Sequence, residues 1–321
     1  MRSTVAFLFP GQGAQAPGMA VDLADAYPEA RAVFERGREV LGRDILAIAR
    51  GGPEEELSST RTSQPAIFLH SMAALEVLGS ALRASAVFPG AQRFCQGVPA
   101  LAAAGLSLGE YSALVFAGSL DFEDALGIVG LRAELMQDAC DETAGAMASV
   151  IGLAAEKVAE VVDGARARGL RVSVANYNSP DQTVISGEAG AVDATVKLLD
   201  EAGARRAIRL KVAGAYHSEL MASATRKLEP HLRKLKIRPP RLPFYSNVSG
   251  TEVSDPEEIR ANLIRQVESS VRWHETVKGL VGRGLRRALE VGPGRVLAGL
   301  LRGVSRDVEV VAAGTCEGAA R

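Results

Sequence analysis

The sequence predicts an α/β protein that has a large body and a smaller inserted domain. Apolar runs of strand length end at glycine-rich turns, and longer segments carry apolar residues at helical spacing. Between residues 143 and 211 these segments follow the order strand, helix, strand, strand, helix, strand, which is the split βαβ arrangement of ferredoxin-like domains. We therefore expect residues 143–211 to form an inserted domain, and residues 1–142 and 212–321 to form the body around it.

The first half of the body is expected to begin with a buried strand. Residues 5–10, VAFLFP, are apolar and stop at GQGAQ, as a buried strand does when it enters a tight loop. A helix is expected from near Gln64, because Pro65 suits a first helical position and the following apolar residues recur at helical spacing. Residues 105–120 predict a tight turn that leads into a helix, and Asp121 is expected to cap the next helix.

The remaining elements follow from the same patterns. The inserted domain is expected to have strands at 145–153, 170–179, 182–188 and 205–211, and helices at 154–169 and 191–203. After it come a polar helix at about 218–236, a strand-like segment at 244–250 and a closing α/β stretch near 289–300.

Composition and charge narrow the class of protein. The chain has 321 residues, of which 47% are hydrophobic and 23% charged, enough for a large core and a smaller one. The net charge of -1 favours neither nucleic acid nor an anionic membrane as a partner, and no signal peptide or membrane-spanning segment is expected. The odd, widely spaced cysteines, Cys95, Cys140 and Cys316, indicate neither a disulfide framework nor a metal site. A cytoplasmic location fits best.

The segment GLSLG, residues 105–109, has the form G-x-S-x-G. Its glycines allow a strand-to-helix turn sharp enough to expose the hydroxyl of Ser107, and the same turn aims backbone N–H groups at one point. Such groups at a helix start suit the oxyanion of an acyl-transfer intermediate. The pattern alone is weak in a chain with 33 glycines, and an ordinary turn serine is the alternative.

A serine nucleophile needs a base, and the chain offers four histidines. His217 follows small residues and precedes an expected helix, where the positive helix end disfavours imidazolium and keeps a base neutral. His70 lies in a packing helix, His231 in a cationic stretch, and His274 beside Trp273 at an expected helix start. His217 is therefore the candidate base, and a packed histidine at a helix start is the alternative.

Arg132 is the most informative single residue. Its helical neighbours at i±3 and i±4 are all apolar: Ile128, Val129, Leu135 and Met136. A buried arginine without a partner is costly, so an anion must meet it, either a distant carboxylate of this chain or a carboxylate of the substrate. The residues alone leave both open.

Two glycine-rich loops suggest nucleotide binding without completing its pattern. The third glycine of G-x-G-x-x-G is replaced by Ala16 in the first loop and by Leu297 in the second, and no P-loop is present. We therefore discount a nicotinamide or nucleoside triphosphate enzyme.

Read together, the motifs resemble those of the malonyl-CoA:acyl-carrier-protein transacylase family of fatty-acid and polyketide synthesis. In the family's order they are FPGQGAQ, TSQPAIF, GLSLGEYSAL, LRAELMQ, GAMASVIGL, NYNSPDQTVISG, AGAYHSELM, FYSNVSG, VRWHET and LEVGPGRVLAGL, and they span nearly the whole chain. The resemblance implies an α/β-hydrolase-like body with a ferredoxin-like insert.

The resemblance also implies roles for particular residues. Ser107 would be the nucleophile, His217 its base, and Arg132 the clamp for the free carboxylate of malonate. The further roles implied are an oxyanion hole of the backbone N–H groups of Gln12 and Leu108, a main-chain carbonyl at Asn247 that orients the histidine, and pocket positions at Gln64 and Tyr216. The implied ping-pong cycle uses malonyl-CoA as substrate and acyl carrier protein as acceptor, with no bound cofactor or metal.

The chain departs from the family's pattern at three places. Leu106 replaces the histidine of the commoner GHSxG turn, and Tyr216 stands where phenylalanine is usual. Residues 84–100 have no clear counterpart. Because the aromatic ring of Tyr216 should crowd a methyl branch, we expect malonyl to be preferred over methylmalonyl.

A local basic patch bears on the carrier partner. From Arg205 to Arg241 there are 11 lysines and arginines against two acids, Glu219 and Glu229. Acyl carrier proteins are acidic, so this patch is expected to steer the carrier toward His217, and a solvated cationic helix without a partner is the alternative. A monomer is expected, as is common in the family.

Three other functions compete with this reading. A polyketide-type free-standing acyltransferase would use the same chemistry as an enzyme of fatty-acid synthesis. A serine thioesterase would release free malonate, and a silent scaffold would form no acyl-enzyme. Arg132 together with Ser107 and His217 favours the transferase.

Overall fold

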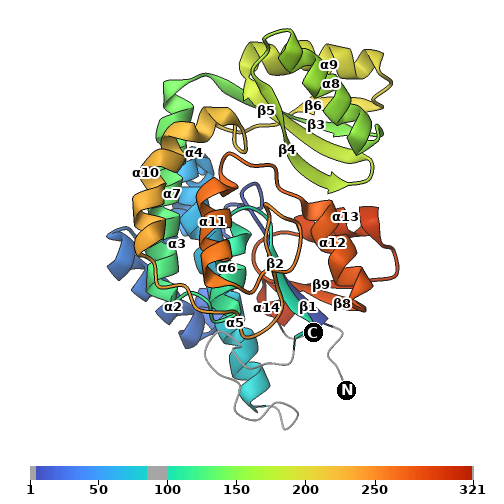
Figure 1. Cartoon of the computed structure of the whole chain (residues 1–321). Coiled ribbons are helices and arrows are strands. Elements are labelled where there is room, and N and C mark those ends of the chain that lie inside the picture. The colour runs from blue at the N-terminus through green and yellow to red at the C-terminus, as the bar shows by residue number, and fades with distance from the viewer. Residues whose placement is uncertain (1–4, 85–99, 320–321) are drawn as a thin grey trace.

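The computed structural model describes residues 5–84 and 100–319, and it contains a parallel sheet and a separate antiparallel sheet (Figure 1). The parallel sheet has the strand order β7-β2-β1-β8-β9. Its strands are β1 (Val5–Phe9), β2 (Ala102–Gly105), β7 (Phe244–Tyr245), β8 (Arg287–Glu290) and β9 (Glu309–Ala312). All neighbouring pairs are parallel, so their carboxyl ends share one edge, where loops bring distant residues together.

Both faces of this sheet are covered, as expected for parallel strands. Alternate residues of β1 enter different cores: Phe7 and Phe9 pack in the larger core with α2, α5, α6 and α7, whereas Ala6 and Leu8 pack with α12 and α13. The helices of the body are α1 (Val21–Ala26), α2 (Pro28–Leu41), α3 (Ile45–Gly51), α4 (Glu54–Ser58), α5 (Thr60–Ala84), α6 (Gly109–Phe116), α7 (Phe122–Glu142), α10 (Ala222–Lys234), α11 (Pro256–Gln266), α12 (Trp273–Gly282), α13 (Val296–Val304) and α14 (Cys316–Ala319), with a short 3-10 helix at Glu219–Met221.

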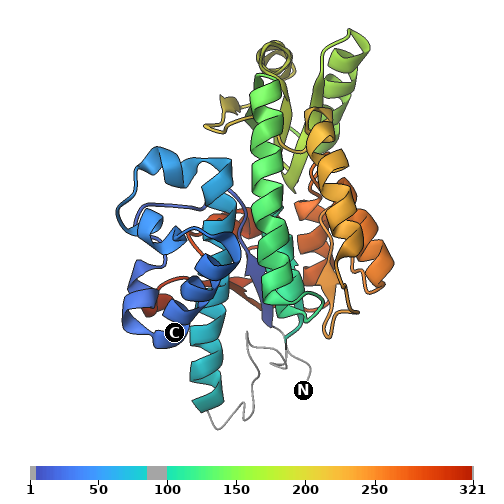
Figure 2. The same ribbon diagram turned by 90° about the vertical axis from the view of Figure 1, so that its left-hand side faces the viewer.

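The second sheet is antiparallel and has its own core. Its elements are β3 (Gly145–Ile151), α8 (Ala155–Ala167), β4 (Val172–Ser179), β5 (Gln182–Glu188), α9 (Ala189–Glu201) and β6 (Arg206–Arg209). The predicted order of strands and helices is confirmed, and the strands lie in the order β4-β5-β3-β6. The long helix α7 runs from the body toward this part of the molecule (Figure 2), and the bridge between Asn176 and Val271 joins the two parts again.

Two helix starts differ from the prediction. Helix α5 begins at Thr60, one turn before Gln64, so Pro65 lies inside the helix. Proline has no N–H for the carbonyl of Arg61, and Arg43 Nη1 donates to that carbonyl at 3.3 Å instead. Asp121 occupies the N-cap of α7, but its carboxylate does not cap the helix. It accepts from the guanidinium of Arg238 at 2.7 and 3.0 Å.

Other sequence features have simpler outcomes. The strand expected at 244–250 is limited to Phe244–Tyr245. Most of the segment without a counterpart, including Cys95, lies outside the described residues, while Cys140 and Cys316 are free thiols. Within the described ranges, no helix combines the length and apolar character needed to cross a membrane.

Candidate active site

Ser107 stands at a strained turn between β2 and α6. Its φ of 51° lies in the left-handed region, which non-glycine residues rarely adopt. The turn closes tightly because Gly105 and Gly109 lack side chains: a Cβ on Gly105 would overlap the Gly109 backbone, and one on Gly109 would overlap the Phe9 carbonyl. The G-x-S-x-G pattern therefore forms the predicted sharp turn.

The backbone of Ser107 is held on both sides by side chains from distant segments. Its N–H donates to Asn247 Oδ1 at 2.5 Å, and its carbonyl accepts from Gln266 Nε2 at 3.0 Å. Asn247 Nδ2 also donates to the carbonyl of Gly105 at 2.6 Å. These bonds stabilise a backbone conformation that serine would otherwise avoid.

His217 is paired with the serine. Its Nε2 lies 2.9 Å from Ser107 Oγ, and its Nδ1 lies 2.9 Å from the carbonyl of Gln266 and 3.0 Å from that of Ser269. Carbonyls only accept, so the proton resides on Nδ1 and Nε2 is free to accept the serine proton. Burial, and next the charge of Arg132, lower the pKa of His217 to about 4, so the ring is neutral at pH 7.

The helix start that the sequence predicted after His217 is present. The 3-10 helix Glu219–Met221 follows the capping Ser218 and leads directly into α10. Burial of a ring that is 4% exposed, together with Arg132, accounts for the shift.

The prediction that the carbonyl of Asn247 orients the histidine is wrong. That carbonyl accepts from the N–H of Arg272 at 2.9 Å, and the orienting carbonyls belong to Gln266 and Ser269 at the end of α11. Asn247 is close to the site, but its side chain supports the serine.

Arg132 is buried beside the nucleophile. It is 1% exposed, and it donates to Gln64 Oε1 at 2.6 Å, Gln266 Oε1 at 3.0 Å and Ser107 Oγ at 3.1 Å. Among the described residues, no carboxylate lies within 4 Å of its guanidinium. Burial lowers the pKa of Arg132, although Glu110 at longer range opposes the shift, which reflects the cost of a buried cation whose hydrogen-bond acceptors are all neutral. The site thus presents an uncompensated positive charge next to the serine hydroxyl.

The loop after β1 completes the surroundings of Ser107. Gly11 lies so close to Leu106 that a Cβ would overlap its carbonyl oxygen, which places Gln12 beside the turn. In the part of the chain that the structure describes, neither the N–H of Gln12 nor that of Leu108 donates to a protein acceptor. Both donors therefore remain available for an oxyanion.

A chain of side-chain hydrogen bonds links this loop to the arginine. Gln64 Nε2 donates to Gln12 Oε1 at 3.3 Å, and Gln12 Nε2 donates to the Tyr216 hydroxyl at 3.3 Å. That hydroxyl also lies 2.6 Å from Thr60 Oγ1. The structure thus brings all eight predicted site residues to one region, with Asn247 in a different role.

Sequence reasoning missed two buried residues of this network, Gln266 and Glu110. Gln266 contacts Ser107, Arg132 and His217, and it donates to Glu110 Oε2 at 2.5 Å. Glu110 directly follows the recognised turn, which was the available signal. Gln266 had none, because its carbonyl acts without regard to side-chain type and its amide reaches Ser107, Arg132 and Glu110 only through tertiary contacts.

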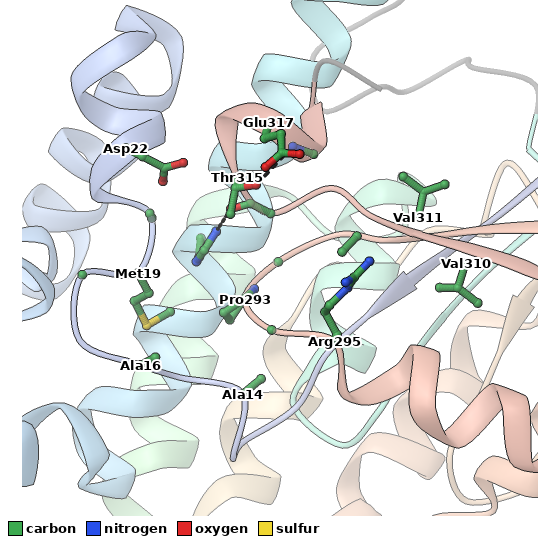
Figure 3. A pocket seen from close by; sticks show the side chains of 18 of the residues that line it. Ala14, Ala16, Met19, Asp22, Pro293, Arg295, Val310, Val311, Thr315 and Glu317 are labelled. Carbon is green, nitrogen blue, oxygen red and sulfur yellow. Dashed lines mark hydrogen bonds between the residues drawn. The ribbon is translucent and has the colours of Figure 1, made fainter.

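Two cavities lie near this region. One of about 410 Å³ is lined by His217, by residues of the loop 268–272 and by residues of α8 and β4, so it opens beside the base, although Ser107 does not line it. The larger one, of about 750 Å³, lies between the loops after β1, β8 and β9 (Figure 3). Asp22 and Met19 lie on one side of it and Arg295 on the other, and its lining lacks Ser107 and His217. The larger cavity is therefore not the candidate site.

The other histidines have different settings. His70 is buried and bonded through Nε2 to the carbonyl of Gly314 at 2.5 Å, while His231 is exposed and His274 is partly exposed. No group of three potential metal-ligating side chains occurs within residues 5–84 and 100–319.

A serine at a strained turn, a neutral histidine within hydrogen-bonding distance and an uncompensated arginine together define an acyl-transfer site of the serine-ester type. The model of the acyl transferase domain family matches residues 6–315, and the chain belongs to this family. Malonyl CoA-acyl carrier protein transacylase from Bacillus subtilis is 39% identical over 310 residues, which cover 97% of this chain and 93% of that protein. The transacylase of the same name from Haemophilus influenzae is 40% identical over 95% of this chain and 94% of its own length.

Solved structures agree with these relatives. An acyl carrier protein S-malonyltransferase from Vibrio cholerae superposes with a TM-score of 0.90 at 40% identity, covering 98% of each chain. A type II PKS acyl carrier protein in complex with its malonyl-transacylase gives a TM-score of 0.90 at 39% identity, covering 99% of this chain and 98% of that chain. The fold is therefore shared over essentially the full length.

Proposed function

We propose that this protein transfers a malonyl group from malonyl-CoA to the phosphopantetheine thiol of acyl carrier protein through an ester on Ser107. One observation carries the proposal: the Arg132 guanidinium lies 3.1 Å from the nucleophilic oxygen and has no carboxylate within 4 Å in the described part of the chain. A bound acyl group that ends in a carboxylate supplies the missing charge. The names of the relatives agree with this substrate.

The first half of the reaction acylates the serine. Ser107 Oγ attacks the thioester carbonyl while His217 Nε2, 2.9 Å away, takes its proton. The oxyanion is stabilised by the N–H groups of Gln12 and Leu108. When the intermediate collapses, the carbon–sulfur bond breaks, and the CoA sulfur receives the proton from His217.

The second half reverses these steps with a different thiol. His217 takes the proton of the carrier's phosphopantetheine thiol, whose sulfur attacks the ester carbonyl. The carbon–oxygen bond breaks and the proton returns to Ser107 Oγ. The cavity of about 410 Å³ beside His217 is the proposed entry for this arm.

Arg132 favours a short diacid. Because Nη2 is already within hydrogen-bonding distance of Ser107 Oγ, the acyl group must bend back to place its carboxylate on the guanidinium. A three-carbon acyl group can do this, and the bound carboxylate fixes its ester for attack by the thiol. The ring of Tyr216, held by Thr60 and Gln12, is proposed to exclude a methyl branch.

The basic patch is proposed as the carrier contact, in a revised form. Its cations lie on two segments, residues 205–211 and 226–241, and four of them are already paired with acids: Arg209 with Asp193, Lys227 with Glu142, Arg233 with Glu229 and Arg238 with Asp121. Exposed Lys211 and Arg226 flank the His217 segment in sequence, whereas Lys234 is the last residue of α10 and Lys236 follows its end.

Charge reversal of each pair of cations tests which of the two pairs contacts the carrier. Lys211→Glu with Arg226→Glu is expected to raise the KM for the carrier without changing the rate with malonyl-CoA. Lys234→Glu with Lys236→Glu is the matched control. Equal effects of the two pairs would indicate a general charge effect and contradict a local contact.

We also propose the finer description of the fold. Residues 143–211 form a ferredoxin-like inserted domain, supported by the order β3-α8-β4-β5-α9-β6, in an α/β-hydrolase-like body of residues 1–142 and 212–321. The protein acts as a cytoplasmic monomer that needs no bound cofactor.

Mass spectrometry tests the proposed function. After mixing with malonyl-CoA, a transferase accumulates a malonyl adduct on Ser107 that the carrier thiol removes, and Ser107→Ala forms none. A thioesterase turns the adduct over without carrier, and a scaffold forms no adduct. Carriers of the fatty-acid and polyketide types, supplied in parallel, decide between the two pathways.

A further inference from the structure

Glu110 is a buried carboxylate directly behind the nucleophile, and the reaction steps above do not use it. It lies in the first turn of α6, three residues after Ser107, and is 1% exposed. Its Oε2 accepts from Gln266 Nε2 at 2.5 Å, and its Oε1 accepts from the N–H of Asn247 at 3.3 Å. Both oxygens are therefore occupied by N–H donors.

The two residues that donate to Glu110 are the two that hold the strained serine. Asn247 accepts the N–H of Ser107, and Gln266 donates to the carbonyl of Ser107. Gln266 also bonds to Arg132 through Oε1 and to His217 through its main-chain carbonyl. The carboxylate thus joins both sides of the clamp around a residue at a φ of 51°.

We propose that ionised Glu110 is a positioning residue that holds Ser107 in its reactive conformation through Asn247 and Gln266. The inference rests on the proposed function, because it assigns a role in forming the Ser107 ester. A carboxylate accepts strongly at both oxygens, whereas a carboxamide accepts at one and turns an NH2 donor toward the other N–H group, and a protonated carboxyl accepts only weakly at its hydroxyl oxygen. Loss of the charge therefore loosens one side of the clamp.

The surroundings place this ionisation near neutral pH. The charged or titratable groups that face Glu110 are Arg132 from α7 and Tyr111 from its own helix. Burial raises the pKa of Glu110 to about 7, although its hydrogen bonds and Arg132 oppose the shift. The pKa of His217 is about 4, so the two groups titrate in separate ranges.

The test uses a probe that reports on Ser107 without malonyl-CoA. An alkyl fluorophosphonate forms a bond from Ser107 Oγ to phosphorus and releases fluoride, while His217 takes the serine proton. In the wild type, the labelling rate is expected to fall about tenfold as pH drops through about 7. In Glu110→Gln the labelling rate at pH 8 is expected to be about tenfold to a hundredfold lower than in the wild type, and its pH profile should show no step near pH 7.

Glu290→Gln is the matched control. Glu290 is also fully buried and accepts two N–H groups, those of Leu297 and Ala298, each at 2.9 Å, but it caps α13. Its variant should label at the wild-type rate with the wild-type pH profile. With malonyl-CoA, Glu110→Gln should lower kcat and leave KM within about twofold, because Arg132 keeps its bond to Gln64.

Each outcome decides the matter. A wild-type profile without any acid-side step above the range in which His217 titrates overturns the inference even if Glu110→Gln does not fold. Equal labelling of Glu110→Gln and the wild type, or an equal loss in Glu290→Gln, also overturns it. If the wild type labels as expected but forms no malonyl adduct, the positioning role stands and the proposed acyl transfer fails.

Discussion

Removal of the Arg132 side chain should convert a malonyl-selective enzyme into one that accepts uncharged acyl groups. Truncating one partner of a buried, hydrogen-bonded charge pair costs about 2–5 kcal/mol, and about 1.4 kcal/mol is a factor of ten in rate. The kcat/KM for malonyl-CoA should thus fall about 30-fold to several thousandfold in Arg132→Ala. The upper part of this range applies, since the side chain is 1% exposed.

The measurement compares malonyl-CoA with acetyl-CoA. The kcat/KM for acetyl-CoA should change less than about tenfold in Arg132→Ala, because an acetyl group has no carboxylate that could bind the arginine. Arg260→Ala is the control: Arg260 is another largely buried arginine, bonded to the carbonyls of Leu232 and Leu235 away from Ser107. An unchanged ratio of malonyl to acetyl transfer in Arg132→Ala would refute the role of the arginine.

Three further predictions concern neighbouring groups. Burial lowers the pKa of both His70 and His217 to about 4 in the folded protein, below the value of about 6.5 expected in the unfolded chain. As the pH falls, the unfolded chain therefore takes up these protons before the folded protein does. The free energy of unfolding should decrease between about pH 6.5 and 4, by up to about 3 kcal/mol for each histidine. Urea titrations against pH should show a smaller fall in His70→Gln than in the wild type, and equal slopes would contradict this. Tyr216→Ala should raise methylmalonyl transfer relative to malonyl transfer about tenfold or more, whereas Tyr216→Phe, which keeps the ring, should not. Burial, and next the charge of Arg132, lower the pKa of His217, and a carboxylate bound to Arg132 offsets that charge. In Glu110→Gln, which lacks the step near pH 7, the acid limb of kcat should therefore lie at higher pH for malonyl-CoA than for acetyl-CoA, and coincident limbs would contradict this.

The parts of the site that were predictable are those in which residue type decides geometry. The sharp turn needs Gly105 and Gly109 because a Cβ at either position overlaps backbone. Arg132 was identifiable because its helical neighbours could not compensate a charge. The order of strands and helices followed for a similar reason, since periods of 2 and 3.6 residues distinguish strands from helices locally.

The parts that were not predictable depend on main-chain groups and on tertiary contacts. Every residue has a carbonyl, so nothing in the sequence marks those of Gln266 and Ser269 as the ones that reach His217. The strand expected at 244–250 is only two residues long in the structure, because its length is set by pairing with β2 and not by the local sequence pattern. Asn247 was placed at the right position but in the wrong role, since proximity does not determine which of its polar groups is used.

Arg132 and Glu110 explain why so much of the site consists of neutral amides. A direct ion pair between these two buried charges would satisfy both, yet would leave no cation for a substrate. The amide of Gln266 lies between them instead, accepting from Arg132 at 3.0 Å and donating to Glu110 at 2.5 Å. Each charge is then oriented without being neutralised, and Arg132 stays available for a carboxylate. Burial is the main reason that His217 stays neutral, and the cation of Arg132 adds to it until an anionic acyl group arrives.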